Sequence, residues 1–353
     1  MTMAKIPVAI LGATGAVGQR FVQLLAAHPW FEIAALAASP RSAGRRYGDA
    51  CHWVLPGGPP DAARDRVVVP LEPGLDTPLV FSALPADAAR DLEPLYAQQG
   101  CAVCSNASAF RQAPDVPLII PEVNADHLSL IPAQRAGRGW KGLIVTSPNC
   151  TTTGIALAVK PLHDAFGLQR LFAVSMQAVS GGGYPGVASL DALDNVLPYI
   201  EGEEEKIERE TRILLGRVQG QARSEAPIIV SAQANRVPVV DGHTICLSLH
   251  FARQPRMDEA IAALAGFRAT GLASGLPSAP RQPVHVRPEP DRPQPRRDRD
   301  AENGTAVSVG RIRTCPLQHL RLVALVHNTL RGGAGGAVLN AELLVAAGLV
   351  KRA

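Results

Sequence analysis

The sequence is poor in aromatic residues, carries little net charge and contains no long hydrophobic run. Aromatic residues make up 4% of the 353 residues, and the formal net charge is only +4. Because charges of both signs are mixed along the chain, no nucleic-acid partner is expected. No stretch approaches the roughly 18 consecutive apolar residues of a membrane-spanning helix, so no membrane partner is expected either.

Cysteine is also scarce, and this bears on the redox environment. Six cysteines in a chain of this length are too few for a disulfide framework. Residues 1–12 lack a signal-peptide cleavage pattern, so we expect a cytoplasmic protein with reduced thiols. Cys101 and Cys104 form a lone CxxC pair, so no metal site is predicted. Three further cysteines are expected to be buried structural thiols: Cys51, Cys246 and Cys315.

Glycine and proline are plentiful, with 32 and 30 residues, and 46% of the chain is hydrophobic. This composition is typical of a globular protein with many turns. Up to residue 150, short apolar runs alternate with amphipathic segments, which predicts a doubly wound parallel sheet. The predicted strands are residues 6–11, 32–37, 66–69, 78–83, 100–104 and 143–146, with helices after the glycine-rich turn at 12–18 and at 86–98.

After residue 150, longer alternating strands predict an α+β domain whose sheet is mostly antiparallel and covered on one face. The predicted elements are helices at 151–162 and 334–348 and strands at 171–179, 227–240, 243–252 and 305–313. We therefore expect an N-terminal Rossmann-type domain at 1–149, completed by 328–353, and a catalytic and dimerisation domain at 150–327. The Pro- and Arg-rich segment 273–300 is expected to be an ordered connection or an exposed arm.

A glycine-rich turn lies between the first predicted strand and the helix that follows it. Gly12 permits the tight turn, Gly15 lets the backbone approach a pyrophosphate, and Gly18 allows close packing of helix and strand. The second strand ends without the acidic residue that NAD enzymes place on the ribose. Ser39 and Arg41 instead suit a 2′-phosphate, so NADP is the predicted cofactor.

Cys150 occupies a different kind of position from the other cysteines. It stands in the run SPNCTTTG (147–154), where a predicted strand gives way to a helix that Asn149 can cap. The unpaired N–H groups and the positive end of the helix dipole favour a thiolate there. The same donors can stabilise an oxyanion on a carbonyl carbon attacked by the sulfur. Cys150 is therefore the predicted nucleophile.

A nucleophilic thiol needs a proton acceptor, and His243 is the best candidate. The Asp241–Gly242 pair is typical of a hairpin turn, which would place Arg236 and His243 on neighbouring strands. His243 could then serve as general base and acid. Arg236 could bind a carboxylate through its planar guanidinium.

Taken together, these motifs resemble the aspartate-semialdehyde dehydrogenase family, in its archaeal and fungal-like branch. The matching segments run almost end to end and include GATGAVGQRF (12–21), SPNCTTTGIALAVKPL (147–162), YIEGEEEKIERET (199–211), NRVPVVDGHT (235–244) and HNTLRGGAGGAVLNAELL (327–344). The resemblance implies NADPH-dependent reduction of 4-aspartyl phosphate to L-aspartate 4-semialdehyde with release of phosphate. The resemblance further implies that the reaction passes through a cysteine thioester and serves the biosynthesis of lysine, threonine, methionine and isoleucine.

The resemblance also implies which residues bind substrate and cofactor. The implied substrate-binding residues are Arg236 for the carboxylate, Glu203 for the ammonium, and Lys206, Arg111 and Asn106 for the phosphate. Which glutamate of 203–205 faces the substrate is left open. The implied cofactor-binding residues are Gly12, Thr14, Gly15, Ala16, Val17, Ser39, Arg41, Ser82, Ala83, Leu84, Ser180, Gly181, Gly182 and Asn328.

Two other functions are compatible with parts of this pattern. Malonyl-CoA reductase resembles the same branch and would keep the glycine turn, Cys150 and His243, but malonyl-CoA has no ammonium for Glu203 to bind. A non-catalytic NADP-sensing protein could share the fold, since fold alone does not show activity. It would not require a thiol at a helix N-terminus. A homodimer or homotetramer is expected.

Overall fold

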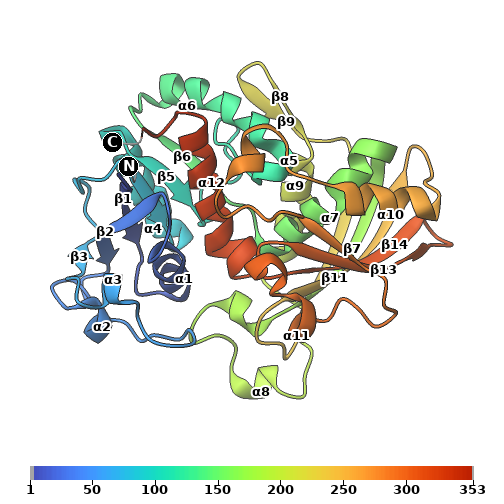
Figure 1. The fold of residues 1–353 in the computed structure, drawn as a ribbon, viewed down its shortest axis with the longest axis horizontal. Helices are drawn as coiled ribbons and strands as arrows, with labels where there is room; N and C mark the ends of the chain where they lie inside the picture. The colour runs from blue at the N-terminus through green and yellow to red at the C-terminus, as the bar shows by residue number, and fades with distance from the viewer. Residues whose placement is uncertain (1–3, 352–353) are drawn as a thin grey trace.

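The computed structural model describes residues 4–351, and its two six-stranded β-sheets lie side by side (Figure 1). The first sheet has the order β3-β2-β1-β4-β5-β6, and all its strand pairs are parallel. Its strands are β1 (Ile6–Leu11), β2 (Phe31–Ala38), β3 (Val69–Pro70), β4 (Leu79–Ser82), β5 (Ala102–Ser105) and β6 (Leu143–Thr146). The predicted doubly wound sheet is confirmed, although the strand predicted at 66–69 is reduced to two residues.

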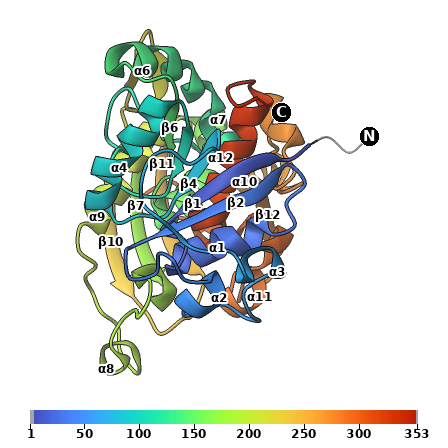
Figure 2. The same cartoon turned by 90° about the vertical axis from the view of Figure 1, so that its left-hand side faces the viewer.

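The helices of this part are α1 (Ala16–Leu25), α4 (Ala86–Gln99), α6 (Ile131–Arg138) and α12 (Gly335–Ala346). The C-terminal helix α12 returns to the first sheet and packs against α1, β4 and β5 (Figures 1 and 2). Strand order reverses between β1 and β4, where ligands bind in open α/β sheets, beyond the carboxyl ends of the strands. The glycine turn lies at this point because it directly follows β1.

The second sheet has the order β10-β7-β11-β14-β13-β12. Its strands are β7 (Leu168–Gln177), β10 (Ile229–Arg236), β11 (His243–Phe251), β12 (Val284–Arg287), β13 (Val307–Thr314) and β14 (Leu320–Val326). The three central pairs are antiparallel and the two outer pairs are parallel, so the expectation of a mostly antiparallel sheet holds for its centre. The strand predicted at 227–240 ends at Arg236, and neither β12 nor β14 is predicted from the sequence.

One face of the second sheet is covered by α7 (Cys150–Phe166) and α10 (Met257–Gly266). Helix α7 is buried along most of its length and packs against β7, β11, β13 and β14. Cys246, at the middle of β11, points to the opposite face and is exposed. The prediction that Cys246 is buried is therefore wrong, because alternate residues of a strand point to opposite faces and no helix within residues 4–351 covers this one.

The remaining elements connect these layers. They are α2 (Tyr47–Ala50), α3 (Asp61–Arg64), α5 (Pro121–Asn124), η1 (Ala125–Leu130), η2 (Val179–Gly182), α8 (Ser189–Ala192), α9 (Glu203–Leu214), β8 (Arg217–Gln219), β9 (Ala222–Ser224), η3 (Gly271–Gly275), α11 (Pro295–Asp298), η4 (Ala301–Gly304) and η5 (Leu330–Ala334). The Pro- and Arg-rich segment is ordered, since Asp298 forms ion pairs with Arg287 and Arg292. Among residues 4–351, no helix has both the length and the apolar character needed to cross a bilayer.

Candidate active site

The glycine turn has the backbone geometry that a bound pyrophosphate requires. Gly12 has a φ of +73°, which favours glycine over residues with a side chain. A Cβ on Gly18 would stand 2.2 Å from the carbonyl oxygen of Gly12, so only glycine lets α1 pack this closely on the turn. Gly15 precedes α1 in an extended conformation, which leaves the start of the helix facing the end of β1. These residues fit a dinucleotide phosphate.

The other predicted cofactor residues lie around this turn. Ser39 and Arg41 are exposed directly after β2, where an adenosine ribose lies in this fold. Ser82 ends β4 and is buried, and Ala83 and Leu84 follow it beside Gly12. The predicted residues at the N-terminus of α1 are Thr14, Ala16 and Val17, all at least partly exposed.

Cys150 is the first residue of α7, as the sequence predicts. The side chain of Asn149 caps the helix, because its Oδ1 accepts hydrogen bonds from the N–H groups of Thr151 and Thr152 at 2.9 and 3.0 Å. The thiol therefore stands at a capped helix N-terminus whose position is fixed by the preceding residue.

His243 contacts the thiol directly. Its Nε2 lies 3.2 Å from the Sγ of Cys150, and its Nδ1 accepts a hydrogen bond from the N–H of Ala178 at 3.0 Å. Since the N–H of Ala178 must donate, the neutral imidazole carries its proton on Nε2, facing the sulfur. In this arrangement His243 donates to the sulfur. To accept a proton at Nε2, the ring must first lose its hydrogen bond from Ala178.

Arg236 and His243 are brought together, but not by the predicted hairpin. β10 and β11 are not neighbours, because β7 pairs with both of them and lies between them. The two side chains instead meet near Gly181: a Cβ there would stand 2.8 Å from Arg236 Nη1 and 3.1 Å from His243 Cε1. Arg236 is buried and donates from Nη1 to the carbonyl of Ala178 at 2.8 Å.

The electrostatics of the thiol differ from the helix-dipole expectation. Although Cys150 is partly exposed as a residue, desolvation of its thiol raises the pKa to about 12, and the negative charge of Glu203 contributes. Arg111, the N–H of Thr151 and Arg236 lower this pKa but do not outweigh burial. Burial, with Arg236 and His327, lowers the pKa of His243 to about 3, so the imidazole is neutral at pH 7.

Glu203 is the glutamate of the EEEK run that points inward. It is buried, and its Oε1 accepts hydrogen bonds from Asn149 Nδ2 at 2.8 Å and Gln177 Nε2 at 3.0 Å. Glu204 instead accepts from the N–H of Ala234 at the edge of β10. Glu205 is exposed. Lys206 is half-buried and has no ion-pair partner within residues 4–351.

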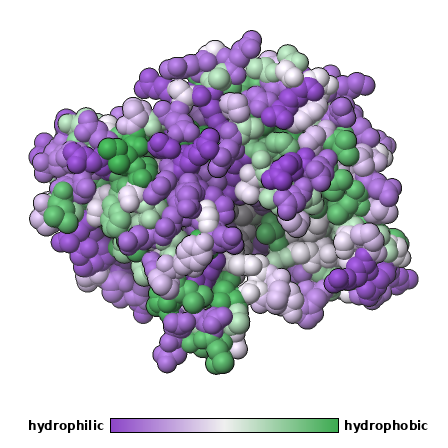
Figure 3. Space-filling view, turned by 180° about the vertical axis from the view of Figure 1, so that it is seen from behind, coloured by the Kyte–Doolittle hydropathy of each residue, from purple (hydrophilic) through white to green (hydrophobic). Residues whose placement is uncertain are grey.

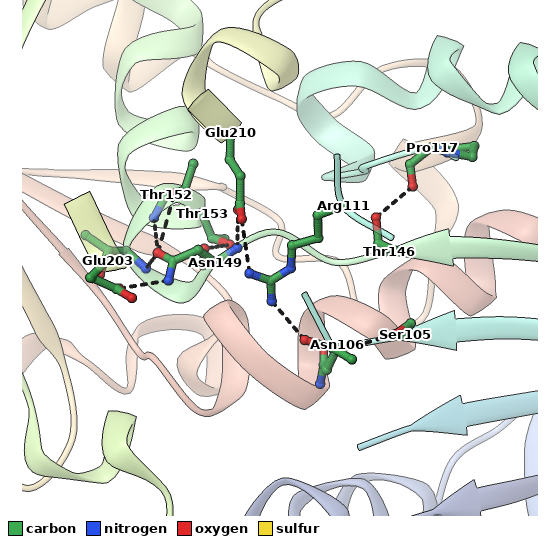
Figure 4. Close-up of polar contacts among 12 residues, drawn as sticks. Ser105, Asn106, Arg111, Pro117, Thr146, Asn149, Thr152, Thr153, Glu203 and Glu210 are labelled. Atoms are coloured by element: carbon green, nitrogen blue, oxygen red, sulfur yellow. Dashed lines mark hydrogen bonds and ion pairs between the residues drawn. The ribbon is translucent and has the colours of Figure 1, made fainter. Parts of the chain in front are cut away.

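Arg111 and Asn106 lie between Asn149 and the strand ends of the first sheet at Ser105 and Thr146 (Figure 4). Arg111 Nη2 donates to the carbonyl of Asn106 at 2.8 Å. Arg111 Nε and Asn106 Nδ2 are buried and have no hydrogen-bond partner in the described part of the chain. Two buried donors without acceptors fit an anionic ligand, because an unsatisfied buried polar group is costly.

Glu210 is a site residue that the sequence reasoning does not identify. It is buried on α9, where its Oε1 accepts from Arg111 Nη1 at 3.1 Å and its Oε2 accepts from the N–H of Asn149 at 2.6 Å. The signal for it is helical periodicity. Glu210 stands two turns after Glu203 and shares its face of the helix, with the buried Ile207 between them.

The segment between β14 and α12, which leads from the second sheet back to the first, packs against the nucleophile. Asn328 is buried, donates from Nδ2 to Ser180 Oγ at 2.8 Å and accepts from the N–H of Gly242. It therefore joins the loop containing Gly181 and Gly182 to the turn before His243. Gly332 lies directly against Cys150: a Cβ on it would stand 2.7 Å from the Cβ of Cys150.

Glu93 is a buried carboxyl group behind the loop that carries Asn106, and its ionisation should make stability depend on pH. It accepts from Ser105 Oγ at 2.6 Å, and burial raises its pKa to about 7. Its contribution to folding is full below about pH 4.5, the ordinary glutamate value, and is lost as the pH rises to about 7. Ionisation of Glu93 should therefore lower the free energy of unfolding of wild type by about 1–3 kcal/mol between pH 4.5 and pH 8. Glu93→Gln carries no titrating group at this position, so it should not show this loss. Denaturant titrations at both pH values measure this difference, and the exposed Asp87→Asn is the control.

Comparisons with known proteins find matches over almost the whole chain. The family model described as "Semialdehyde dehydrogenase, NAD binding domain" matches residues 7–131, and "Semialdehyde dehydrogenase, dimerisation domain" matches residues 159–331. The chain is 51% identical to an aspartate-semialdehyde dehydrogenase of Archaeoglobus fulgidus, over 97% of this chain and 98% of that protein. It is 48% identical to one of Cryptococcus neoformans, over 98% and 99%. The crystal structure of the Candida albicans enzyme with NADP aligns with a TM-score of 0.90 and 43% identity, covering 98% of this chain and all of that one.

Proposed function

The chain belongs to the aspartate-semialdehyde dehydrogenase family, an NADP-dependent group in amino-acid biosynthesis, and from this premise we propose how its residues perform the reaction. In the biosynthetic direction, the sulfur of Cys150 attacks the acyl carbon of 4-aspartyl phosphate. The C–S bond forms, the C–O bond to phosphate breaks, the thiol proton leaves with the released phosphate, and a thioester remains. The observation that carries the proposal is the contact between Cys150 and His243 at the capped start of α7.

NADPH, when bound, would supply the hydride that reduces the thioester to a thiohemiacetal, and the glycine turn, Ser39 and Arg41, and the loop at Ser180 would hold it. The chain's own residues position the acyl group and stabilise charge. His243 holds a proton at Nε2 beside the sulfur, where it stabilises the sulfur anion as the C–S bond of the thiohemiacetal breaks. Cleavage of that bond releases the aldehyde.

Each charged group of the substrate has a partner of opposite charge in this proposal. Arg236 binds the carboxylate and Glu203 the ammonium, and both are buried near Cys150. Arg111 Nε and Asn106 Nδ2 are the free donors for the phosphate, with Lys206 on the next turn of α9 after Glu203. Because an ammonium on Glu203 offsets the charge that raises the pKa of Cys150, amino-bearing substrates should also assist thiolate formation.

The test of this function is substrate choice. Purified protein should reduce NADP⁺ with aspartate semialdehyde through repeated turnovers only when phosphate is present, because without phosphate the reaction stops at the thioester after one turnover. Malonyl-CoA should give no NADPH oxidation, because Glu203 would then be a buried carboxylate without a cation. Activity with malonyl-CoA alone would overturn the assignment.

The cofactor preference should depend on Arg41. We expect Arg41→Ala to raise the KM for NADP about tenfold, because a charge-assisted contact to the 2′-phosphate is lost, and to leave the KM for NAD unchanged. Steady-state kinetics with both cofactors measure this, with Arg45→Ala, also exposed on the same loop, as the control. An equal effect on both cofactors would place Arg41 away from the 2′-phosphate.

We also propose that the chain forms a homodimer through the uncovered side of its second domain. The match to a dimerisation domain supports this, as does a group of exposed apolar residues on the segment that contains α8: Leu190, Leu193, Val196 and Tyr199. Figure 3 shows apolar surface at the lower end of the molecule, where this segment projects in Figure 1. A contiguous exposed apolar patch of this kind marks an interface.

The oligomeric state should respond to charge in that segment. Light scattering should give twice the chain mass, or a larger multiple, for wild type, and the monomer mass for the double variant Leu190→Asp, Leu193→Asp. Burying two carboxylates in an apolar interface is costly. Leu317→Asp, in the exposed turn between β13 and β14, is the matched control and should not change the mass. A monomeric wild type contradicts the proposal.

The domain limits proposed for this chain are 1–149 with 328–353, and 150–327. Packing of α12 against α1, β4 and β5 supports assignment of the C-terminal residues to the cofactor domain.

A further inference from the structure

Glu210 connects two parts of the site that carry different steps of the reaction. Its Oε1 accepts a hydrogen bond from Arg111 Nη1 at 3.1 Å, and its Oε2 accepts one from the backbone N–H of Asn149 at 2.6 Å. The side chain is only 3% exposed, so both bonds are shielded from water. One carboxylate thus joins the arginine proposed to bind phosphate to the residue that precedes the nucleophile (Figure 4).

The remaining contacts of these two partners leave little freedom to either. Arg111 also donates from Nη2 to the carbonyl of Asn106, so two of its five N–H groups are engaged, and Nε is the nitrogen left without a partner in the described part of the chain. Asn149 uses its side chain to cap α7 and to donate to Glu203. The bond from its backbone N–H to Glu210 therefore completes the set of contacts that places Cys150.

We propose that Glu210 is a positioning residue that fixes Arg111 and Cys150 relative to each other, so that phosphate on Arg111 faces the acyl carbon on the sulfur. This inference rests on the proposed function, in which Arg111 binds phosphate. Glu210 touches neither the reacting carbon nor the phosphate, and it acts through the two groups that it holds. The relative position of Arg111 and Cys150 governs the rate of acyl transfer, because phosphate and the acyl carbon react only when they are aligned.

Glu210→Gln tests this role with little change in size. The amide has one acceptor oxygen and a donor nitrogen, whereas both partners of Glu210 are N–H donors, so only one of the two contacts can survive. In single-turnover experiments without phosphate, the aldehyde adds to Cys150 and transfers its hydride to NADP⁺, which leaves the thioester. We expect the rate of this step to fall about tenfold and the steady-state KM for phosphate to rise about tenfold. NADP affinity should not change.

Three further variants separate a loss of positioning by Glu210 from a folding defect and from a loss of phosphate binding by Arg111. Glu205→Gln, an exposed residue of the same helix, should change neither quantity. Glu210→Asp keeps both acceptor oxygens on a shorter side chain and should give intermediate values, which keeps the test valid if Glu210→Gln folds poorly. Arg111→Lys should raise the KM for phosphate without slowing the single-turnover step that forms the thioester on Cys150.

An effect of Glu210→Gln on only one of the two measurements, or on neither, would overturn the joint role. If Arg111→Lys leaves the KM for phosphate unchanged, the phosphate assignment of Arg111 fails. If Arg111→Lys raises that KM and Glu210→Gln does not, the role of Glu210 alone fails.

Discussion

Replacement of Cys150 by serine should reduce kcat for phosphate-dependent NADP⁺ reduction by on the order of 10⁴-fold or more. A hydroxyl is a far weaker nucleophile than a thiol at neutral pH, and the site offers it no strong base. The imidazole of His243 carries its proton on the nitrogen that faces the sulfur, and its pKa is lowered to about 3. Steady-state kinetics with aspartate semialdehyde measure the loss.

The Cys150→Ser variant should keep its affinity for NADP, because the glycine turn follows β1 of the first sheet, whereas Cys150 begins α7, which covers the second sheet. Fluorescence titration with NADPH provides this control. Cys246→Ser, at an exposed thiol on β11, should retain full activity. Turnover of Cys150→Ser within tenfold of wild type would remove the thiol from the mechanism.

The second large effect is expected at Gly332, a residue far from Cys150 in the sequence. A Cβ there would stand 2.7 and 2.8 Å from the Cβ and Cα of Cys150, and 3.0 Å from its carbonyl oxygen. Since carbon atoms that are not bonded do not approach this closely, Gly332→Ala must displace η5 or the start of α7, and we expect the start of α7 to move. A shift of the nucleophile by about 1 Å costs on the order of 10²-fold in rate. We expect a loss in kcat of this size.

Gly137→Ala is the matched control for Gly332→Ala, because a Cβ at this position in α6 meets no atom within 4 Å. It should leave kcat unchanged. The thermal midpoint should fall for Gly332→Ala alone. Wild-type kcat in Gly332→Ala would show that the backbone at η5 yields without moving Cys150.

Local patterns predict the nucleophile and the cofactor turn well. The helix begins at Cys150 with Asn149 as its cap because strand, proline, capping residue and helix follow one another directly in the sequence. The glycine turn follows β1 for the same reason. Such features depend on neighbouring residues, and their geometry is read without knowledge of the rest of the fold.

Long-range packing accounts for what the sequence reasoning misses. The Asp241–Gly242 pair looks like a hairpin turn, yet the chain crosses β7, since strand order in a sheet is set by distant contacts. The helix dipole favours a thiolate, yet burial and Glu203 raise the pKa of Cys150 to about 12. The contact of Gly332 with Cys150 joins residues far apart in the sequence and leaves no local signal.

The covalent intermediate on Cys150 is the central claim, and mass spectrometry of the protein incubated with aspartate semialdehyde and NADP⁺ without phosphate tests it most directly. We predict one aspartyl acyl group per chain, located on the peptide that contains Cys150 and lost on addition of phosphate. An unmodified Cys150 after NADPH has formed, or an acyl group on another residue, would contradict the account.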